Sequence, residues 1–126
     1  SIVAQRVTVM QAERTARQAE ARVLAREFLA ATKPCERHVE RKKSGEGIPW
    51  SVVSDSTEKM WLTYQALDAL GPLTLGPCAL KYMDAIYGEF DEAPGTPIGH
   101  LMTPARDALL TEIRRTLGMG APHRPR

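Results

Sequence analysis

The N-terminal stretch constrains the fold most strongly, because residues 2–31 contain neither glycine nor proline. Ala, Arg, Glu, Gln and Leu dominate this stretch, and these residues have high helix propensities. The first proline, Pro34, cannot donate the backbone hydrogen bond that a helix interior requires. We therefore expect one helix of about eight turns that ends before Pro34.

A basic loop is expected to connect this helix to the rest of the domain. Residues 33–54 are polar and rich in Lys and Arg, and they contain Gly45, Gly47 and Pro49, residues that favour turns. Trp50, which lies in the same stretch, is expected to plug one end of a helical bundle.

Three shorter helices are expected after the loop, because apolar residues recur there at helical spacing. Each begins at a residue that favours a helix N-terminus, namely Asp55, Pro77 or Thr103, and Gly118 closes the last one. The six-residue linker at 71–76 makes the second and third helices neighbours. The fold prediction is therefore all-α: a four-helix bundle-like domain with a long N-terminal helix and a short-turn helical hairpin in the middle. The prediction places a single domain at residues 1–118 and a basic, flexible tail at residues 119–126.

The formal net charge of +2 conceals three blocks of alternating sign. Residues 1–47 carry +4, residues 48–102 carry −5 and residues 103–126 carry +3. Blocks of opposite charge can attract one another within a chain or between copies. We expect the acidic middle hairpin to lie near the basic first and last helices.

Motifs for catalysis and cofactor binding are missing from the sequence. It contains no Gly-x-Ser-x-Gly elbow and no glycine-rich phosphate loop. Cys35-x-x-His38 has the spacing of a metal-ligand pair, but Cys78 and His100 are too far apart to form the second close pair of a zinc site. We therefore expect no catalytic residues, no cofactor and no metal, and we expect a binding protein rather than an enzyme.

Self-association, or binding to a helical protein partner, is the principal functional hypothesis. A helix of about 30 residues spans about 45 Å and outreaches helices of half that length. Its overhanging end would expose the candidate interface residues Ile2, Val3, Val7 and Met10.

Two alternatives remain open at this stage. Nucleic-acid binding would use a basic patch formed by Arg37, Arg41, Lys42 and Lys43, but nearby glutamates and a pI of 8.7 make this hypothesis weaker. Binding of a small apolar ligand would use a groove between the second and third helices. The groove would be lined by aromatic residues that are most simply core residues: Trp61, Tyr64, Tyr82, Tyr87 and Phe90.

A cytoplasmic location is expected from the cysteine content. Cys35 and Cys78 are too few for a disulfide framework and indicate free thiols in a reducing compartment. Twelve Arg against five Lys and the lack of Asn are typical of a GC-rich bacterial genome. The sequence has no membrane span. Because it begins at Ser1 rather than Met, the prediction of a cytoplasmic location includes the alternative of an upstream membrane anchor, which would make the domain membrane-proximal.

Overall fold

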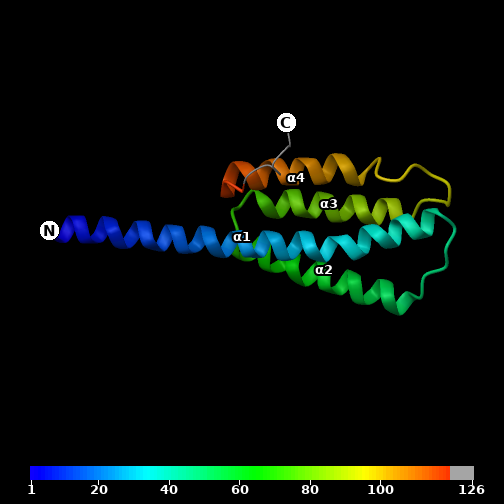
Figure 1. Ribbon diagram of the computed structural model, residues 1–126, viewed down its shortest axis with the longest axis horizontal. Helices are drawn as coiled ribbons and strands as arrows, with labels where there is room; N and C mark the ends of the chain where they lie inside the picture. The colour runs from blue at the N-terminus through cyan, green and yellow to red at the C-terminus, as the bar shows by residue number, and fades with distance from the viewer. Residues whose placement is uncertain (120–126) are drawn as a thin grey trace, which may run out of the picture.

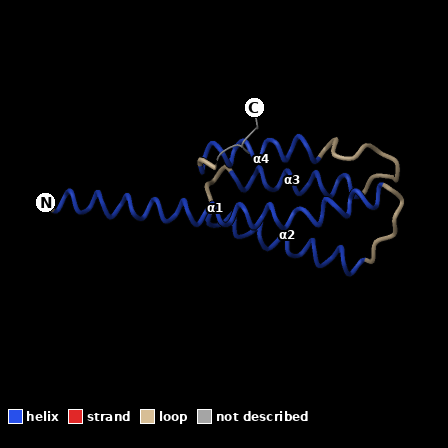
Figure 2. The backbone as a smooth tube through the Cα atoms, in the orientation of Figure 1, coloured by secondary structure: helices blue, strands red, loops and turns tan. Residues whose placement is uncertain are grey.

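Four helices make up the part of the chain that the computed structural model describes, residues 1–119, and no strand occurs within that range (Figures 1 and 2). They are α1 (Ile2–Lys43), α2 (Trp50–Leu70), α3 (Leu75–Phe90) and α4 (Met102–Leu117). Consecutive helices run in opposite directions, and α1 packs chiefly on α2 while α3 packs chiefly on α4 (Figure 1). The predicted all-α architecture with a long N-terminal helix is confirmed. Most of the predicted tail, residues 120–126, lies outside the described residues.

The core lies between the helices and receives apolar side chains from all four. Phe28 of α1 and Tyr82 of α3 are fully buried, and their rings meet edge to face with centroids 6.4 Å apart. Around them lie Met60 and Leu67 of α2 and Leu109 of α4, also fully buried. Because α1 first contributes a buried residue at Ala21, the core is confined to its C-terminal half.

The prediction that the first helix ends before Pro34 is wrong, because α1 continues through this residue to Lys43. Cys35, His38 and Val39 lie on the buried face beyond the proline. Full burial of an apolar side chain such as Val39 stabilises by about 1.5–3 kcal/mol, and burial of Cys35 adds to this, so that packing beyond the proline offsets the cost of about 3 kcal/mol for a proline inside a helix. Tertiary packing therefore overrides the local signal.

The predicted basic loop over residues 33–54 is correspondingly too long, because only residues 44–49 connect α1 to α2. Pro49 occupies the N-cap position of α2, where its carbonyl accepts hydrogen bonds from the amides of Val52 and Val53. Trp50 does not plug the bundle, since 74% of its surface is exposed. By contrast, α3 and α4 begin within two residues of the predicted positions.

Replacement of Pro34 by alanine is expected to stabilise the domain by about 2 kcal/mol. The substitution restores an amide that can bond to the preceding turn, and it removes the clash of the proline ring. It also raises the conformational entropy of the unfolded chain, which offsets a small part of this gain. Chemical denaturation measures the difference in the free energy of unfolding. Pro49→Ala is the matched control and should destabilise slightly, because Pro49 stands before the helix and obstructs no hydrogen bond. Equal or lower stability of Pro34→Ala would contradict the expectation.

A backbone carbonyl at the C-terminal end of α4 is bound by α1. Gly118 adopts a left-handed conformation with φ of 62°, and its amide donates to the carbonyl of Arg114. Arg22 of α1 donates through Nε to the carbonyl of Leu117 at 2.8 Å. This contact satisfies a carbonyl that has no partner within the helix. The predicted end of the fourth helix at Gly118 is confirmed.

Candidate functional site

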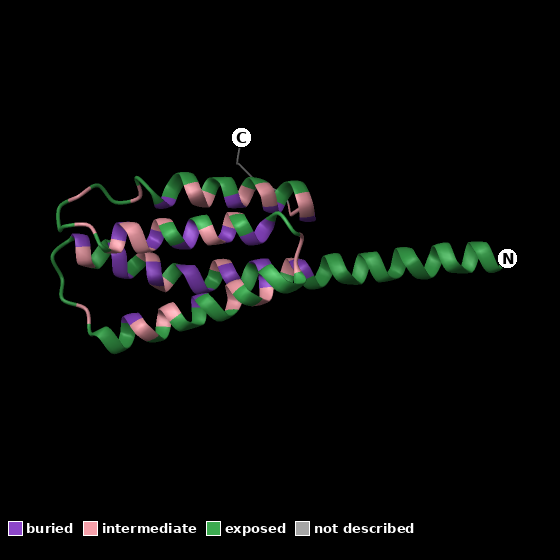
Figure 3. Cartoon of the chain, turned by 180° about the vertical axis from the view of Figure 1, so that it is seen from behind, coloured by how far each residue is buried: buried purple, intermediate pink, exposed green. Residues whose placement is uncertain are grey.

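The N-terminal half of α1 projects beyond the bundle as a free helix (Figures 1 and 3). We call residues 1–20 the arm, since every one of them is exposed. Ser1 caps the arm, because its Oγ accepts a hydrogen bond of 3.2 Å from the amide of Ala4. Among residues 1–119, no helix is both long enough and apolar enough to cross a membrane.

An apolar seam runs along the arm. It consists of Val3, Val7 and Met10, which are 72%, 48% and 61% exposed. Their spacing of four and three residues places them on one face of the helix. Continued along α1, the same spacing leads through Arg14 and Arg17 to the face that enters the core. The seam is therefore an outward continuation of the core-facing side of α1.

The candidate interface residue Ile2 is also exposed, but it lies outside the seam. Ile2 and Val9 are seven residues apart and share a face that points away from the seam. All four candidate interface residues, Ile2, Val3, Val7 and Met10, thus lie on the arm with no covering contact from the bundle.

A buried ion pair joins the C-terminal end of α1 to the end of α3. Lys43 Nζ lies 2.7 Å from Glu89 Oε1 and 2.9 Å from Glu92 Oε1, and it also donates to the carbonyl of Pro97 at 2.7 Å. The side chains of Lys43 and Glu89 are essentially inaccessible to solvent. A further bond of 2.9 Å runs from the amide of Gly95 to the carbonyl of Lys43. The loop between α3 and α4 is therefore fastened to the end of α1.

Glu89 also caps α4. Its Oε2 accepts hydrogen bonds from the amides of Leu101 and Met102, and its Oε1 accepts one from the amide of Gly99. These amides lie at the N-terminus of α4, whose own N-cap residue, Leu101, provides no side-chain acceptor. A carboxylate at this end of a helix is also favoured by the helix dipole. Glu89 therefore holds together α1, α3 and α4.

The protonation of this pair follows from its hydrogen bonds. Burial alone would raise the pKa of Glu89, but the bonds from Lys43 and from three backbone amides outweigh it and lower this pKa to about 2. Burial would likewise lower the pKa of Lys43, but its hydrogen bonds to Glu89 and Glu92 and their charges hold it above its ordinary value. Both groups are therefore charged at neutral pH.

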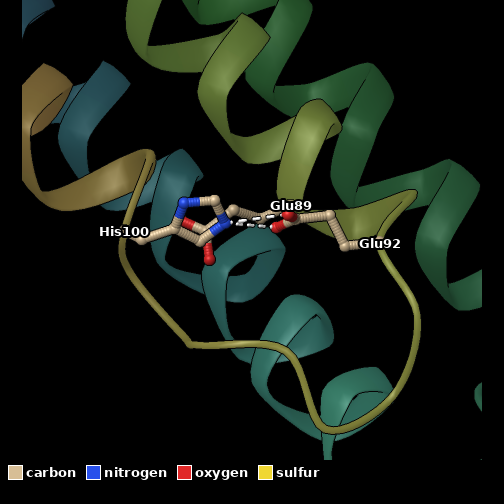
Figure 4. Close-up of side chains that lie close together, drawn as sticks. All are labelled: Glu89, Glu92 and His100. Carbon is tan, nitrogen blue, oxygen red and sulfur yellow. Dashed lines mark hydrogen bonds and ion pairs between the residues drawn. The ribbon is translucent and has the colours of Figure 1, made fainter.

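Glu89, Glu92 and His100 form the one group of three metal-capable side chains that lie close together within residues 1–119 (Figure 4). His100 Nε2 lies 2.6 Å from Glu92 Oε1, and Glu89 reaches the same cluster from α3. Lys43 Nζ already contacts both carboxylates, so an ammonium group supplies the positive charge there. The arrangement fits a structural ion network better than a metal centre.

The candidate basic patch is divided among different environments. Lys43 is buried, and Arg41 Nε donates to Glu46 at 2.7 Å. Lys42 Nζ donates to the carbonyl of Phe90 and lies 4.5 Å from the centroid of its ring. Only Arg37 is exposed without a contact among those described. These contacts weaken the nucleic-acid hypothesis, which requires cations that are open to a phosphate backbone.

The five candidate aromatic residues do not line one groove. Tyr82 belongs to the core, and Trp61 packs edge to face on Tyr64 with ring centroids 5.5 Å apart. Tyr87 and Phe90 instead line a cavity of about 180 Å³. This cavity lies between α1, α2 and α3 rather than between the second and third helices alone.

The ion pair was not among the predicted site residues, although the spacing of apolar residues contains a signal for it. Glu89 follows Ile86 by three residues on the buried face of α3, and Lys43 follows Val39 by four on that of α1. The expected break at Pro34 concealed the position of Lys43.

Comparison with known proteins finds no match to this chain among family models, curated proteins or solved structures.

Proposed function

We propose that this domain is a self-association module in which the arm of one chain pairs with the arm of a second copy. One observation carries the proposal: the arm is exposed along its whole length, and its seam continues the core-facing side of α1. A surface that carries on a buried stripe is suited to packing against another helix.

The energetics of an uncovered arm support this proposal. Isolated helices are only marginally stable in water, and most helical stability in proteins comes from packing of an apolar face. The arm has no such packing within its own chain. Covering Val3, Val7 and Met10 would contribute about 1 kcal/mol for each partly buried side chain. A partner helix would therefore stabilise the arm as it binds.

Charge favours an antiparallel pair of arms. Parallel pairing would place Arg14 and Arg17 against the same residues of the second copy, and like charges in a seam are destabilising. Antiparallel pairing can place Val7 beside Met10 of the second copy and Val3 beside its Arg14. The aliphatic stem of Arg14 can cover the valine while the guanidinium group reaches water.

The same antiparallel register pairs opposite charges beside the seam. Arg6 and Glu13 occupy equivalent flanking positions seven residues apart, so that Arg6 of each chain lies beside Glu13 of the other. Charges at such positions set the orientation of paired helices. Parallel pairing would place both residues opposite glutamines, Gln11 and Gln18. The register thus supports two symmetric ion pairs around a short apolar centre.

Light scattering after size exclusion tests the proposal by measuring the absolute mass of the particle. The expected result is a mass near twice the chain's 13.9 kDa, with dissociation on dilution. Raised salt should weaken the dimer moderately, because it screens the flanking ion pairs. A mass of one chain at every concentration would contradict self-association and direct attention to a different helical partner.

A further inference from the structure

The cavity between α1, α2 and α3 opens to solvent on the side where α2 and α3 face each other. Its inner wall includes buried residues such as Met60 of α2 and Ile86 of α3. Trp50 at the start of α2 and Asp91 at the end of α3 also line it, and both are exposed, so they mark its mouth. A cavity of about 150 Å³ can hold benzene, so the volume of about 180 Å³ suits one aromatic ring.

Both tryptophans of the chain are exposed on this side of α2. Trp50 is 74% exposed and Trp61 is 39% exposed. They are eleven residues apart, which is close to three helical turns and places them on one face of α2. Thr57, which lines the cavity, lies one turn before Trp61 on the same face. Tryptophan is enriched among the residues that dominate binding to a protein partner, so this face suits an interface.

Three carboxylates surround the two tryptophans. Asp84 and Asp91 are seven residues apart and share a face of α3. Asp68 of α2 reaches the start of α3, because its Oδ1 occupies the space that a Cβ atom on Gly76 would need. All three aspartates are exposed, and none takes part in an ion pair within residues 1–119. We call the surface formed by Trp50, Trp61, Asp68, Asp84 and Asp91 the acidic face.

The charges of two of these carboxylates reach the aromatic residues between α2 and α3. Trp61 packs on Tyr64 with ring centroids 5.5 Å apart. Burial raises the pKa of the Tyr64 hydroxyl, and the charges of Asp68 and Asp84 raise it further. The carboxylates from the two helices therefore converge beside the exposed aromatic surface.

Nearby cations leave the acidic face without a paired positive charge. Lys59 and Lys81 are the only cations of α2 and α3. Lys59 is nine residues from Trp50 and therefore lies on the opposite face of α2, and Lys81 forms no ion pair in the part of the chain that the structure describes. Lys42 of α1 instead donates to the carbonyl of Phe90. A positively charged partner would meet no competing cation from these helices.

We propose that the acidic face binds a basic amphipathic helix of a partner protein, which inserts one phenylalanine into the cavity and places Lys or Arg residues beside Asp84 and Asp91. Seven residues of a helix span about 10 Å, so cations one heptad apart on an adjacent helix match these two carboxylates. Recognition of an amphipathic helix through anchor side chains is a recurring mode of binding. The arm of a second copy fits less well, because it contains no aromatic residue and its three arginines are accompanied by two glutamates.

Fluorescence titration of the full chain with synthetic peptides tests this proposal. The probe is an alanine-rich helical peptide with a central phenylalanine, a leucine four residues to each side, and lysines that flank this apolar stripe. It contains no tryptophan, so a change in Trp fluorescence reports contact with the acidic face. Replacing its phenylalanine by alanine should weaken binding at least about tenfold, and replacing its lysines by glutamates should abolish binding. Equal affinity of the phenylalanine and alanine peptides, or no fluorescence change with the probe, would overturn the proposal.

Substitutions in the chain locate the bound peptide. Asp84→Asn with Asp91→Asn should weaken binding about tenfold, because each exposed ion pair contributes about a factor of three. Asp55→Asn with Asp107→Asn is the matched control, since it removes the same charge from exposed positions outside the acidic face and should preserve binding. Thr57→Leu fills part of the cavity and should remove the advantage of the phenylalanine peptide over the alanine peptide.

Two outcomes of these substitutions would contradict the proposal. Equal loss of affinity in the two double variants would show attraction to the net charge of the chain rather than to the acidic face. Self-association of the chain that is lost in Asp84→Asn with Asp91→Asn, measured by light scattering without peptide, would show that a second copy occupies the face.

Discussion

Lys43→Met is expected to destabilise the domain by about 3–5 kcal/mol, the typical cost of removing one partner from a buried ion pair. The substitution leaves the Glu89 carboxylate charged and fully enclosed, with only backbone amides to stabilise it. It also removes the bonds from Lys43 to Glu92 and to the carbonyl of Pro97. Domains of this size have total stabilities of about 5–15 kcal/mol, so the loss is a large fraction of the whole. Urea denaturation followed by circular dichroism measures it.

Three comparisons control this experiment. Lys33→Met, at an exposed position on the same helix, should change stability by less than about 0.5 kcal/mol. Lys43→Met combined with Glu89→Gln should recover part of the loss, because it removes the unpaired charge. The pH dependence provides the third. Since folding lowers the pKa of Glu89 from 4.5 to about 2, its ionised form stabilises the native state fully above pH 4.5, and this contribution disappears as the pH falls through about 2.

Two results together would contradict a stabilising role for the ion pair. They are a small effect of Lys43→Met on the free energy of unfolding, and a pH dependence of stability in the double variant that equals that of the unsubstituted chain. A large loss of stability in Lys43→Met, with partial recovery in the double variant, would instead show that the pair holds α1, α3 and α4 together. Its position explains the expectation, because the same carboxylate pairs with a lysine and caps a helix that lacks its own capping side chain.

The fold could be predicted largely from helix propensity and turn residues, because these signals are local. Pro77 and Thr103 placed the starts of α3 and α4 within two residues, and Gly118 marked the end of α4. The course of α1 beyond Pro34 could not be predicted in the same way. It depends on contacts with α2 and α3 that a local reading of the sequence does not contain.

Sequence reasoning located the arm more successfully than the polar contacts. The exposure of Val3 and Val7 follows from the greater length of the first helix, which the composition of residues 2–31 predicts. The environment of Lys43 instead depends on Glu89, forty-six residues further along the chain, and on a loop that folds back to meet both. The cavity at His38 depends on three helices at once. Sites built from distant segments are therefore the part that the sequence alone conceals.

Replacing the seam of the arm is expected to raise the dissociation constant of the dimer at least about a thousandfold. Val3→Gln, Val7→Gln and Met10→Gln together remove six apolar side chains from the paired arms, at about 1 kcal/mol each. Glutamine keeps a high helix propensity, so the arm itself remains compatible with a helix. The fold of residues 50–118 should survive, because every seam residue is exposed and lies outside the core. Analytical ultracentrifugation measures dissociation, and circular dichroism measures the fold.

Ile2→Gln with Val9→Gln is the matched control, since both residues are exposed and apolar but lie away from the seam. This control should leave the dimer nearly unchanged, and equal loss in both variants would contradict the proposed seam. Charge exchange then tests the orientation of the arms. Glu13→Arg should weaken the dimer by placing two arginines together, and addition of Arg6→Glu should restore it, because the two pairs are re-formed with exchanged signs. A parallel dimer would show no such recovery, because its register places neither residue beside the other.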